Sequence, residues 1–370
     1  MELLLTSFGE AATYGLYILV AVLLLLLMIT VHEAGHYFAG KIFGFGIEEF
    51  SIGFGPKIFS RVKKNGEKFS VRLIPLGGYC AFCGEDEDAD DEKAFNNKKP
   101  WQRIIVLISG ALMNYLTAIV LIALMFGIYG HSAIMAYQTA EDNPYGEEYS
   151  LRDRDVIVKA DGKTVYLITD LMAALDGKKQ GESVDFYLFR EGEYITVPIK
   201  LCADADFKNV EDLETVSRAL NIYYGEEDGE AVSGFRTTGL KLGFFETVGR
   251  SFEYSFKLAG TVFTVFRQLF TGVLGIKSVG GTITTVNVAA NAIRAGGVWS
   301  FLNIAAFIGV NLAVFNLIPF PALDGSRVVF TLIEWIRGKP VKRKVEAVIH
   351  TVGFVIILCF AIFVDLQGCF

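Results

Sequence analysis

The stretch AVLLLLLMITVHEAGH, at residues 21–36, joins a run of apolar side chains directly to the pentapeptide HEAGH. If this stretch is one helix, His32 and His36 are four positions apart and project from one face, where they can share a metal ion. Glu33 then lies close enough to activate a water molecule at the metal. A carboxylate near the centre of a bilayer costs about 2.5–3.5 kcal/mol on insertion scales. We therefore predict zinc chemistry inside a membrane. The alternative is a polar cluster that only holds helices together.

The composition is that of a membrane protein with room for one soluble domain. The chain has 370 residues, 52% of them hydrophobic, and a mean hydropathy of +0.42. Four segments are long and apolar enough to cross about 30 Å of hydrocarbon, at residues 14–43, 104–129, 299–318 and 347–364. We predict an α-helical polytopic membrane protein with four transmembrane helices. The first segment lacks a basic leader and is too long for a signal peptide, so we expect no cleavage.

The distribution of basic residues predicts the topology. Residues 1–40 contain no Lys or Arg, whereas 11 lie at 41–103 and six lie at 327–344. By the positive-inside rule, the short connections are cytoplasmic and both termini are extracytoplasmic. The long region between the second and third spans is then extracytoplasmic as well. The net charge of −7 argues against a nucleic-acid partner.

Residues 44–100 show strand character rather than helical periodicity. Polar and apolar residues alternate at 47–52, 57–62 and 68–74, and Asn65-Gly66 suits a tight hairpin turn of type I′. We predict a membrane-associated β-hairpin or small sheet. It is either a stabilising cap or an exposed edge for an unwound substrate, and the sequence leaves both open.

Two features of this loop are interpreted as secondary. The acidic run at residues 85–92 is interpreted as a solvated linker. Cys80 and Cys83 form a CxxC without a second pair, which is weak support for a metal site and is interpreted as incidental.

Residues 131–235 are predicted to form one compact extracytoplasmic α+β domain. Alternating runs at 156–165, 183–190 and 194–199 predict strands, and residues 168–176 predict a short helix between them.

Residues 240–297 have a different pattern. Apolar residues, most of them phenylalanines, recur at three- and four-residue steps from 245 to 270, with charged residues between them. This predicts an amphipathic helix in the membrane interface, with packing on the external domain as the alternative. Residues 280–297 are rich in Gly, Ala, Thr and Asn and predict an irregular or re-entrant return to the third span.

The chain is thus divided into seven parts. They are the first span with HEAGH (1–43), the β loop with its acidic linker (44–100), the second span (101–130), the external domain (131–235), the interfacial helix and re-entrant segment (240–297), the third span with its proline motif (298–325), and the fourth span (346–366).

A catalytic zinc takes three protein ligands, so HEAGH needs a partner. His131 and His350 belong to no motif. The stretch NLIPFPALDG, at residues 316–325, ends the third span on the cytoplasmic side, where two prolines break the helix. Asp324 is either a residue that only forms the turn or the third ligand, and beside HEAGH we prefer the ligand. The amide of Asn316 could bind substrate backbone or an oxyanion.

HEAGH in the first span and NLIPFPALDG in the third together resemble the site-2 protease family of intramembrane zinc metalloproteases. The overall plan is similar to the bacterial regulator-of-sigma-E-protease branch, with four spans and external PDZ material. Three stretches of the cytoplasmic loop are also similar: GFGP at 53–56, PLGGY at 75–79 and FNNK at 95–98. The resemblance covers nearly the whole chain.

The resemblance implies roles for five residues. His32, His36 and Asp324 would be the zinc ligands. Glu33 would be the general base, and Asn316 would contact the substrate. The resemblance also implies that the external domain is a single PDZ domain and that the protein lies in a bacterial inner membrane, with its active site toward the cytoplasmic side.

Three stretches depart from the family pattern. Residues 109–114, SGALMN, lack the usual proline, and residues 278–282, SVGGT, replace a Ser-Gly-Pro-like loop. The PDZ opening at 146–151, GEEYSL, lacks the usual small residues. None of these changes touches the proposed zinc ligands.

We expect a zinc endopeptidase that cuts a peptide bond within a transmembrane helix of single-span membrane proteins. On the behaviour of the family, anti-sigma factors or remnant signal peptides are the expected substrates. One alternative is a PDZ membrane scaffold with a structural or vestigial metal site, against which Glu33 argues because a structural zinc needs no base. A metal transporter would need acidic residues continuing through other spans, and the sequence has none.

Overall fold

The structure is a computed structural model that describes residues 2–85, 90–140, 143–207, 212–227, 230–271 and 280–368. Residues 86–89 of the acidic run and residues 278–279 of the SVGGT stretch lie outside the described residues. The chain divides into two compact units. Unit 1 comprises residues 1–124 and 251–370, and unit 2 comprises residues 125–250.

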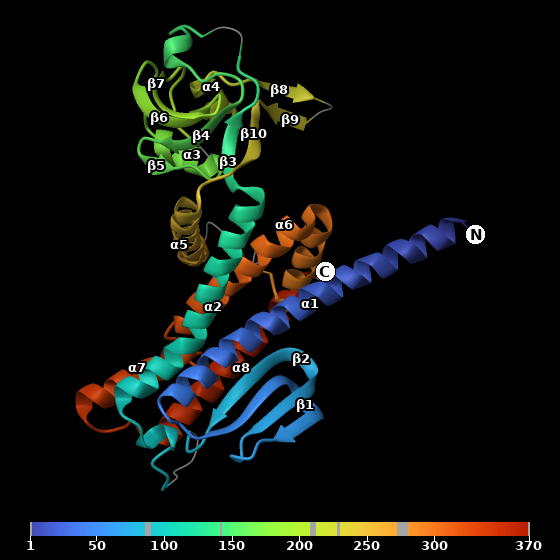
Figure 1. Cartoon of the computed structure of the whole chain (residues 1–370), viewed down its shortest axis with the longest axis vertical. Coiled ribbons are helices and arrows are strands. Elements are labelled where there is room, and N and C mark those ends of the chain that lie inside the picture. The colour runs from blue at the N-terminus through green and yellow to red at the C-terminus, as the bar shows by residue number, and fades with distance from the viewer. Residues whose placement is uncertain are drawn as a thin grey trace. The chain divides into compact units, whose positions relative to one another are not determined.

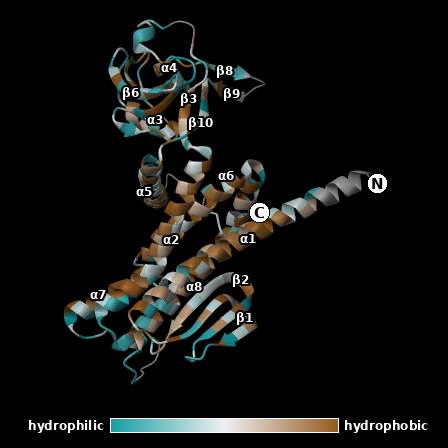
Figure 2. Cartoon of the chain, in the orientation of Figure 1, coloured by the Kyte–Doolittle hydropathy of each residue, from teal (hydrophilic) through white to brown (hydrophobic). Residues whose placement is uncertain are grey.

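Four helices of unit 1 are long and apolar enough to cross a membrane, as predicted. The apolar stretches are Glu10–Ile42 in α1 (Glu2–Ile42), Pro100–Tyr129 in α2 (Pro100–Tyr129), Ile283–Leu317 in α6 (Thr282–Leu317) and Lys344–Leu366 in α8 (Arg343–Gly368). The hydropathy colouring shows these four helices as predominantly apolar (Figures 1 and 2). A shorter helix, α7 (Asp324–Arg337), lies between α6 and α8 in the chain.

The spanning helices approach one another closely where small residues meet. A Cβ added to Gly35 of α1 would lie 2.3 Å from the Ser109 carbonyl oxygen of α2. In the same way, Ala21 packs in a buried cluster with Ala289 and Ala290 of α6. Small residues permit this approach because apolar attraction between helices is absent in lipid and close packing has to replace it.

The start of α6 differs from the prediction. Residues 280–297 were expected to be irregular or re-entrant, but the structure places a helix from Thr282 up to a kink at Gly297, whose φ of 57° and ψ of −136° interrupt the helical path. The expectation of irregular backbone was wrong. The alanines of this segment favour helix, and Ala289 and Ala290 are buried against α1.

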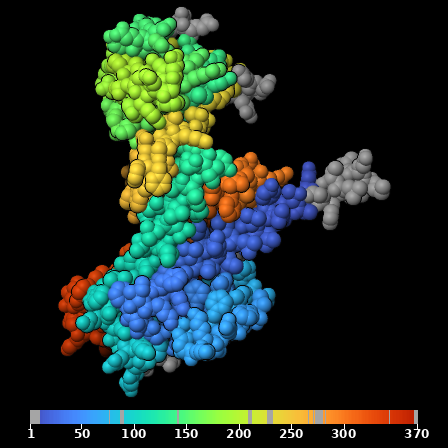
Figure 3. All heavy atoms as spheres, viewed as in Figure 1, coloured from blue at the N-terminus to red at the C-terminus, as the bar shows by residue number. Residues whose placement is uncertain are grey.

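The predicted loop sheet consists of two long strands, β1 (Ile47–Val62) and β2 (Lys68–Phe82), which pack against α1 (Figure 3). Each strand bends, so that Phe50 pairs with Phe69 on one side and with Cys80 on the other. Gly53, at φ 85°, allows the bend because a Cβ there would lie 2.7 Å from the Ile74 carbonyl oxygen. The result is a four-segment sheet in which residues 78–82 pair only with β1 among the described strands.

Arg72 stabilises this sheet from its centre. Its guanidinium donates to the Glu49 carboxylate at 3.0 Å, to the Tyr79 hydroxyl at 2.6 Å and to the Ser51 hydroxyl at 3.0 Å. Burial raises the pKa of Glu49, but hydrogen bonds from Ser70, Arg72 and Tyr79 outweigh it and lower that pKa to about 2. Glu49 is therefore ionised at neutral pH.

The turn of the hairpin is not of the predicted type. A type I′ turn needs a positive φ at both central residues, and of the Asn65-Gly66 pair only Gly66 has one, at 88°. The amide of Gly66 donates to the Lys63 carbonyl at 3.0 Å, and the amide of Lys63 donates to the Glu67 carbonyl at 2.8 Å. This is a three-residue loop, in which the glycine takes the left-handed position that closes it.

The predicted interfacial helix is present as α5 (Phe244–Phe270). In unit 1 its buried side chains include Ser251, Ser255 and Leu258, whereas Phe256 and Phe263 are 64% and 61% exposed. Because the phenylalanines point outward and the serines inward, the exposed face of the helix suits lipid better than water. Its place in the interface remains a prediction.

Unit 2 has a mixed α+β fold with its own core. The sheet order is β10-β3-β4-β6-β7, with β5 beside β4. The predicted strands are present as β4 (Asp155–Ala160), β5 (Lys163–Thr164), β6 (Ser183–Arg190) and β7 (Glu193–Lys200), and the predicted helix as α3 (Ile168–Leu175). The remaining elements of this unit are β3 (His131–Ala136), a short 3-10 helix (Glu147–Tyr149), α4 (Leu213–Ala219), β8 (Tyr224–Glu227), β9 (Glu230–Ser233) and β10 (Phe235–Leu240).

The sheet of unit 2 extends past the predicted end of the domain at residue 235. Strand β10 pairs with β3 along its whole length, from Phe235 with Ala136 to Leu240 with His131. The sequence signal was missed because Thr237, Thr238 and Gly239 give this strand no apolar alternation.

The close contact at Gly35 gives a testable prediction. Gly35→Ala should lower the thermal midpoint of the detergent-purified protein, because overpacking a tight contact costs about 1–3 kcal/mol and the neighbour here is backbone. Gly15→Ala is the matched control in the same helix, since a Cβ there meets nothing within 4 Å. Thermal unfolding measures both. Equal midpoints for the two variants would contradict the close approach of α1 and α2.

Candidate metal centre

The two histidines of HEAGH lie on one face of α1 and point into unit 1. His32 and His36 are buried, with exposed fractions of 6% and 7%. Gly110 of α2 lies directly opposite, and a Cβ there would come within 2.4 Å of His36 Nε2 and 2.8 Å of His32 Cε1. The His36 Nδ1 lies 2.8 Å from the Val106 carbonyl oxygen. If it donates to that oxygen, His36 Nε2 has its lone pair toward the cluster, as a ligand requires.

The third side chain of the group is that of Asp324, which is positioned by the break in the chain after α6. The helix ends at Leu317, and the prolines of NLIPFPALDG turn the chain before α7 begins at Asp324. Within that turn the Leu323 amide donates to the Phe320 carbonyl at 3.1 Å. Asp324 is therefore the first residue of a new helix and lies against α1 rather than continuing the path of α6.

The side chains of His32, His36 and Asp324 form one cluster. The Asp324 Oδ2 lies 3.0 Å from His32 Nε2 and 3.3 Å from His36 Nε2, and the two Nε2 atoms are 3.1 Å apart. Ligand atoms about 2.0–2.2 Å from a tetrahedral zinc are separated by about 3.3–3.6 Å, so these residues fit the ion closely. Among the described residues, this is the group able to hold a metal through three ligand atoms.

The Asp324 carboxyl suits a cation by its position. One of its oxygens lies within hydrogen-bond distance of both imidazoles, so the three side chains present one carboxylate and two ring nitrogens toward the same point.

Glu33 and Asn316 line a cavity of about 250 Å³ beside this cluster. The other lining residues include Ile29, Gly77, Gly78 and Leu312. Glu33 is half-buried and contacts the backbone of Cys80. The carboxylate of Glu33 is thus next to the ligand group without belonging to it, and Asn316 faces the same space from α6.

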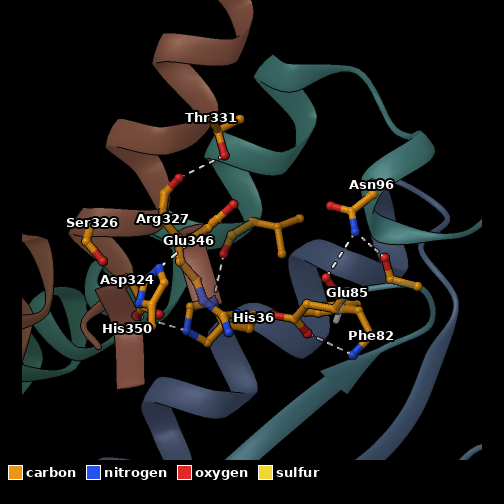
Figure 4. Close-up of polar contacts among 12 residues, drawn as sticks. His36, Phe82, Glu85, Asn96, Asp324, Ser326, Arg327, Thr331, Glu346 and His350 are labelled. Atoms are coloured by element: carbon orange, nitrogen blue, oxygen red, sulfur yellow. Dashed lines mark hydrogen bonds and ion pairs between the residues drawn. The ribbon is translucent and has the colours of Figure 1, made fainter. Parts of the chain in front are cut away.

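A second cavity, of about 440 Å³, adjoins Glu33 and His36 and is lined by residues that no sequence motif selected. They include Glu85, Arg327 and His350. Arg327, one turn after Asp324, forms an ion pair with Glu85, the first residue of the acidic run (Figure 4). Glu85 is therefore anchored to α7. The one signal in the sequence for this ion pair is the spacing of Arg327, which follows Asp324 by three residues and therefore lies on the same face of a helix.

Asn114 of α2 ends the SGALMN stretch noted in the sequence, where it was assigned no role. It is fully buried, and within the described part of the chain neither polar atom of its side chain has a hydrogen-bond partner. The same holds for His32 Nδ1. Asn114 lies one helical turn beyond Gly110, which touches the His32 ring. Its signal in the sequence is a polar residue in an apolar span.

Neither thiol of the CxxC belongs to the ligand group, although Cys80 lines the 440 Å³ cavity together with His36 and Asp324. Burial raises the pKa of the Cys80 thiol, with the Glu33 carboxylate adding to the effect, and burial also raises the pKa of Cys83. Both are therefore neutral thiols at physiological pH, which is the opposite of what thiolate ligands need.

Comparison with known proteins gives one consistent result. The model of peptidase family M50 matches residues 20–360. A relative from Clostridium perfringens, named a "putative zinc metalloprotease", is 31% identical over 353 residues, which cover 95% of this chain and 98% of the relative. Relatives with the same description in Fusobacterium nucleatum and Brucella suis are 29% and 26% identical, covering 94% and 100% of this chain and 97% and 100% of their own lengths. Because the match spans nearly the whole chain and includes the His-His-Asp group, the protein belongs to peptidase family M50, the site-2 protease family, and is a zinc metalloprotease.

Proposed function

We propose that this protein is an intramembrane zinc endopeptidase that cleaves single-span membrane proteins within, or at the edge of, their transmembrane helix. The observation that carries the proposal is the buried group of His32, His36 and Asp324, built from apolar helices with Glu33 beside it. Ionisable residues in such surroundings are costly and are kept for function.

The geometry supports a proposed role for each residue. His32, His36 and Asp324 hold the zinc, and Glu33 remains free to accept a proton. Zinc bound there supplies Lewis-acid activation of water, lowering its pKa to about 7. Glu33 takes the proton from the attacking water and delivers it to the leaving amine. Asn316, on the same cavity, hydrogen-bonds the substrate backbone or the developing oxyanion.

A substrate helix has to unwind before its peptide bond can be attacked, because helical hydrogen bonds shield the amide. Gly77 and Gly78 line the cavity with Glu33, and residues 78–82 are paired on one side only among the described strands. This supports the second of the two roles left open for the sheet, in which β2 holds an extended substrate segment as an added strand.

The orientation in the membrane rests on charge. Basic residues concentrate in the two short connections, so these face the cytoplasm of a bacterial inner membrane and both termini face outside. HEAGH and NLIPFPALDG both adjoin the basic connections. The active site accordingly lies toward the cytoplasmic side, and unit 2 lies outside.

Unit 2 is proposed to be a PDZ domain that limits access by size. Substrates would reach the site after an earlier external cut, and anti-sigma factors and remnant signal peptides have the required form. Peptide recognition is a second candidate role. A cavity of about 430 Å³ runs beside the edge strand β10 and is lined by apolar residues that include Ile134, Ile168, Leu213 and Phe235. A scaffold with a vestigial metal site is disfavoured, since Glu33 adjoins the ligand group.

The ligand assignment is tested by zinc content. His32→Ala, His36→Ala and Asp324→Ala should each lower the zinc bound per chain, because two remaining protein ligands hold the ion weakly. Asp365→Asn is the control, since Asp365 accepts a hydrogen bond from the Ile283 backbone outside the cluster. Metal analysis of purified protein measures the occupancy. If Asp324→Ala keeps its full zinc content and full cleavage activity, Asp324 is not the third ligand.

The role of Glu33 is tested by an isosteric change. Glu33→Gln should lower cleavage by about 10²–10⁴-fold or more while zinc remains bound, because the amide keeps the shape and removes the base. Cleavage of a single-span substrate and zinc content are measured on the same preparation, with a chelator-treated sample as the inactive control. Near-normal turnover in the zinc-loaded variant would exclude Glu33 as the base.

The role of unit 2 is tested by deleting residues 140–232. The flanking strands remain joined, because Tyr137 and Gln138 both donate to the Gly234 carbonyl. Catalysis should persist, and full-length substrates that otherwise need external trimming should be cut, as shown by electrophoresis. Leu213→Glu, which alters the cavity without removing bulk, is the comparison. If the deletion variant binds zinc but does not cleave untrimmed substrates, unit 2 does not act by size exclusion. Peptide recognition is then the better explanation of its role.

A further inference from the structure

The turn that delivers Asp324 contains a strained residue. In the turn from Phe320 to Leu323, Pro321 takes the second position and Ala322 the third, with φ at 80°. A positive φ at the third position is the mark of a type II turn, which favours glycine there because a Cβ is disfavoured. Ala322 is two residues from Asp324. The chain therefore needs something outside the turn to stabilise this conformation.

Helix α8 supplies a partner for that residue. The Ala322 amide donates to His350 Nδ1 at 3.0 Å. The central amide of such a turn is directed away from the hydrogen bond that closes it, so it needs an outside acceptor where water is scarce. Figure 4 shows His350 beside Asp324 and His36, although the three residues come from three different helices.

A glycine one turn along α8 allows this contact. A Cβ added to Gly353 would lie 2.3 Å from Pro321 Cβ and 2.7 Å from the Pro321 carbonyl oxygen. The backbone of α8 therefore lies directly against the turn. On its other side the His350 ring packs near Phe330 of α7, with ring centroids 5.7 Å apart. The imidazole is thus held between the turn and the helix that Asp324 begins.

We infer that His350 is a positioning residue for the metal centre: its Nδ1 holds the Ala322 turn in the conformation that places Asp324 against His32 and His36. The inference rests on the proposed ligand role of Asp324. His350 itself is outside the three-atom cluster and contributes an acceptor, not a ligand. The neutral imidazole has its proton on Nε2 in this arrangement, since Nδ1 accepts.

The experiment distinguishes the hydrogen-bond acceptor of His350 from the bulk of its imidazole ring. His350→Leu removes the acceptor, whereas His350→Asn keeps an oxygen near the Nδ1 position. Zinc affinity is measured on detergent-purified full-length protein by competition with a chelator. His350→Leu should weaken zinc binding by about 10–100-fold, the usual effect of losing a group that orients a ligand. His350→Asn should retain affinity close to that of the unaltered protein.

A second substitution tests the strain directly. Glycine adopts the positive φ at position 322 without a Cβ, so Ala322→Gly in the His350→Leu background should restore most of the lost zinc affinity. Glu346→Gln, one turn earlier on α8, is the control with no expected change, because its nearest oxygen is 3.9 Å from His350 Nε2. If His350→Leu does not accumulate, His350→Gln replaces it, since its amide reaches beyond the Nδ1 position.

Three outcomes would overturn the inference. They are unchanged zinc affinity in His350→Leu, equal losses in the Leu and Asn variants, and no recovery with Ala322→Gly. Failure of the ligand assignment gives a different result, because Asp324→Ala would then bind zinc as tightly as the unaltered protein whatever occupies position 350.

Discussion

The structure of unit 1 depends on bringing one carboxylate to two imidazoles in surroundings that solvate charge poorly. His32 and His36 are buried between apolar helices, and Asp324 meets them at 3.0 and 3.3 Å. Ionisable groups within membrane spans are rare, and they usually face the interior of the bundle or a cavity and pair with one another or with backbone carbonyls. The close approach of α1 and α2 at Gly35 and the break in α6 both follow from this requirement.

The break in α6 serves two purposes at once. It leaves Asn316 on the cavity that holds Glu33, and it allows α7 to begin with Asp324. Irregular backbone at membrane depth is tolerated only where protein or an internal cavity surrounds it. Here α8 lies against the turn through Gly353 and His350, so the fourth span is part of the support of the metal centre rather than a separate anchor.

The proposed tasks of the two units differ. Every residue assigned to zinc binding, proton transfer or substrate contact belongs to unit 1, and unit 2 has a separate core built on β4, β6 and α3. Because unit 2 holds none of the assigned residues, its proposed role is to control which substrates reach the site. The edge strand β10 and the cavity beside it are the features that support the other proposed role, peptide binding.

Much of this protein could be predicted from its sequence, because local patterns have local causes. The helical period puts His32 and His36 on one face, and long apolar runs require spanning helices. Alternation predicted four of the strands in unit 2, whereas β10 was missed because its threonines and glycine carry no such pattern. The hairpin turn was assigned the wrong type, since loop length rather than the Asn65-Gly66 pair decides which residue takes the positive φ.

Only the tertiary structure could decide what lies beside the metal centre. Asp324 is 292 residues from His32, and proximity over that separation depends on how four helices pack. Neither His350 nor Asn114 was assigned a role from the sequence, yet the first hydrogen-bonds the Asp324 turn and the second is buried one helical turn from Gly110, which lies against the His32 ring. A hydrogen bond to a backbone amide leaves no pattern in sequence, because any acceptor at the right place can make it. The chemistry was therefore predictable from short motifs, and its structural support was not.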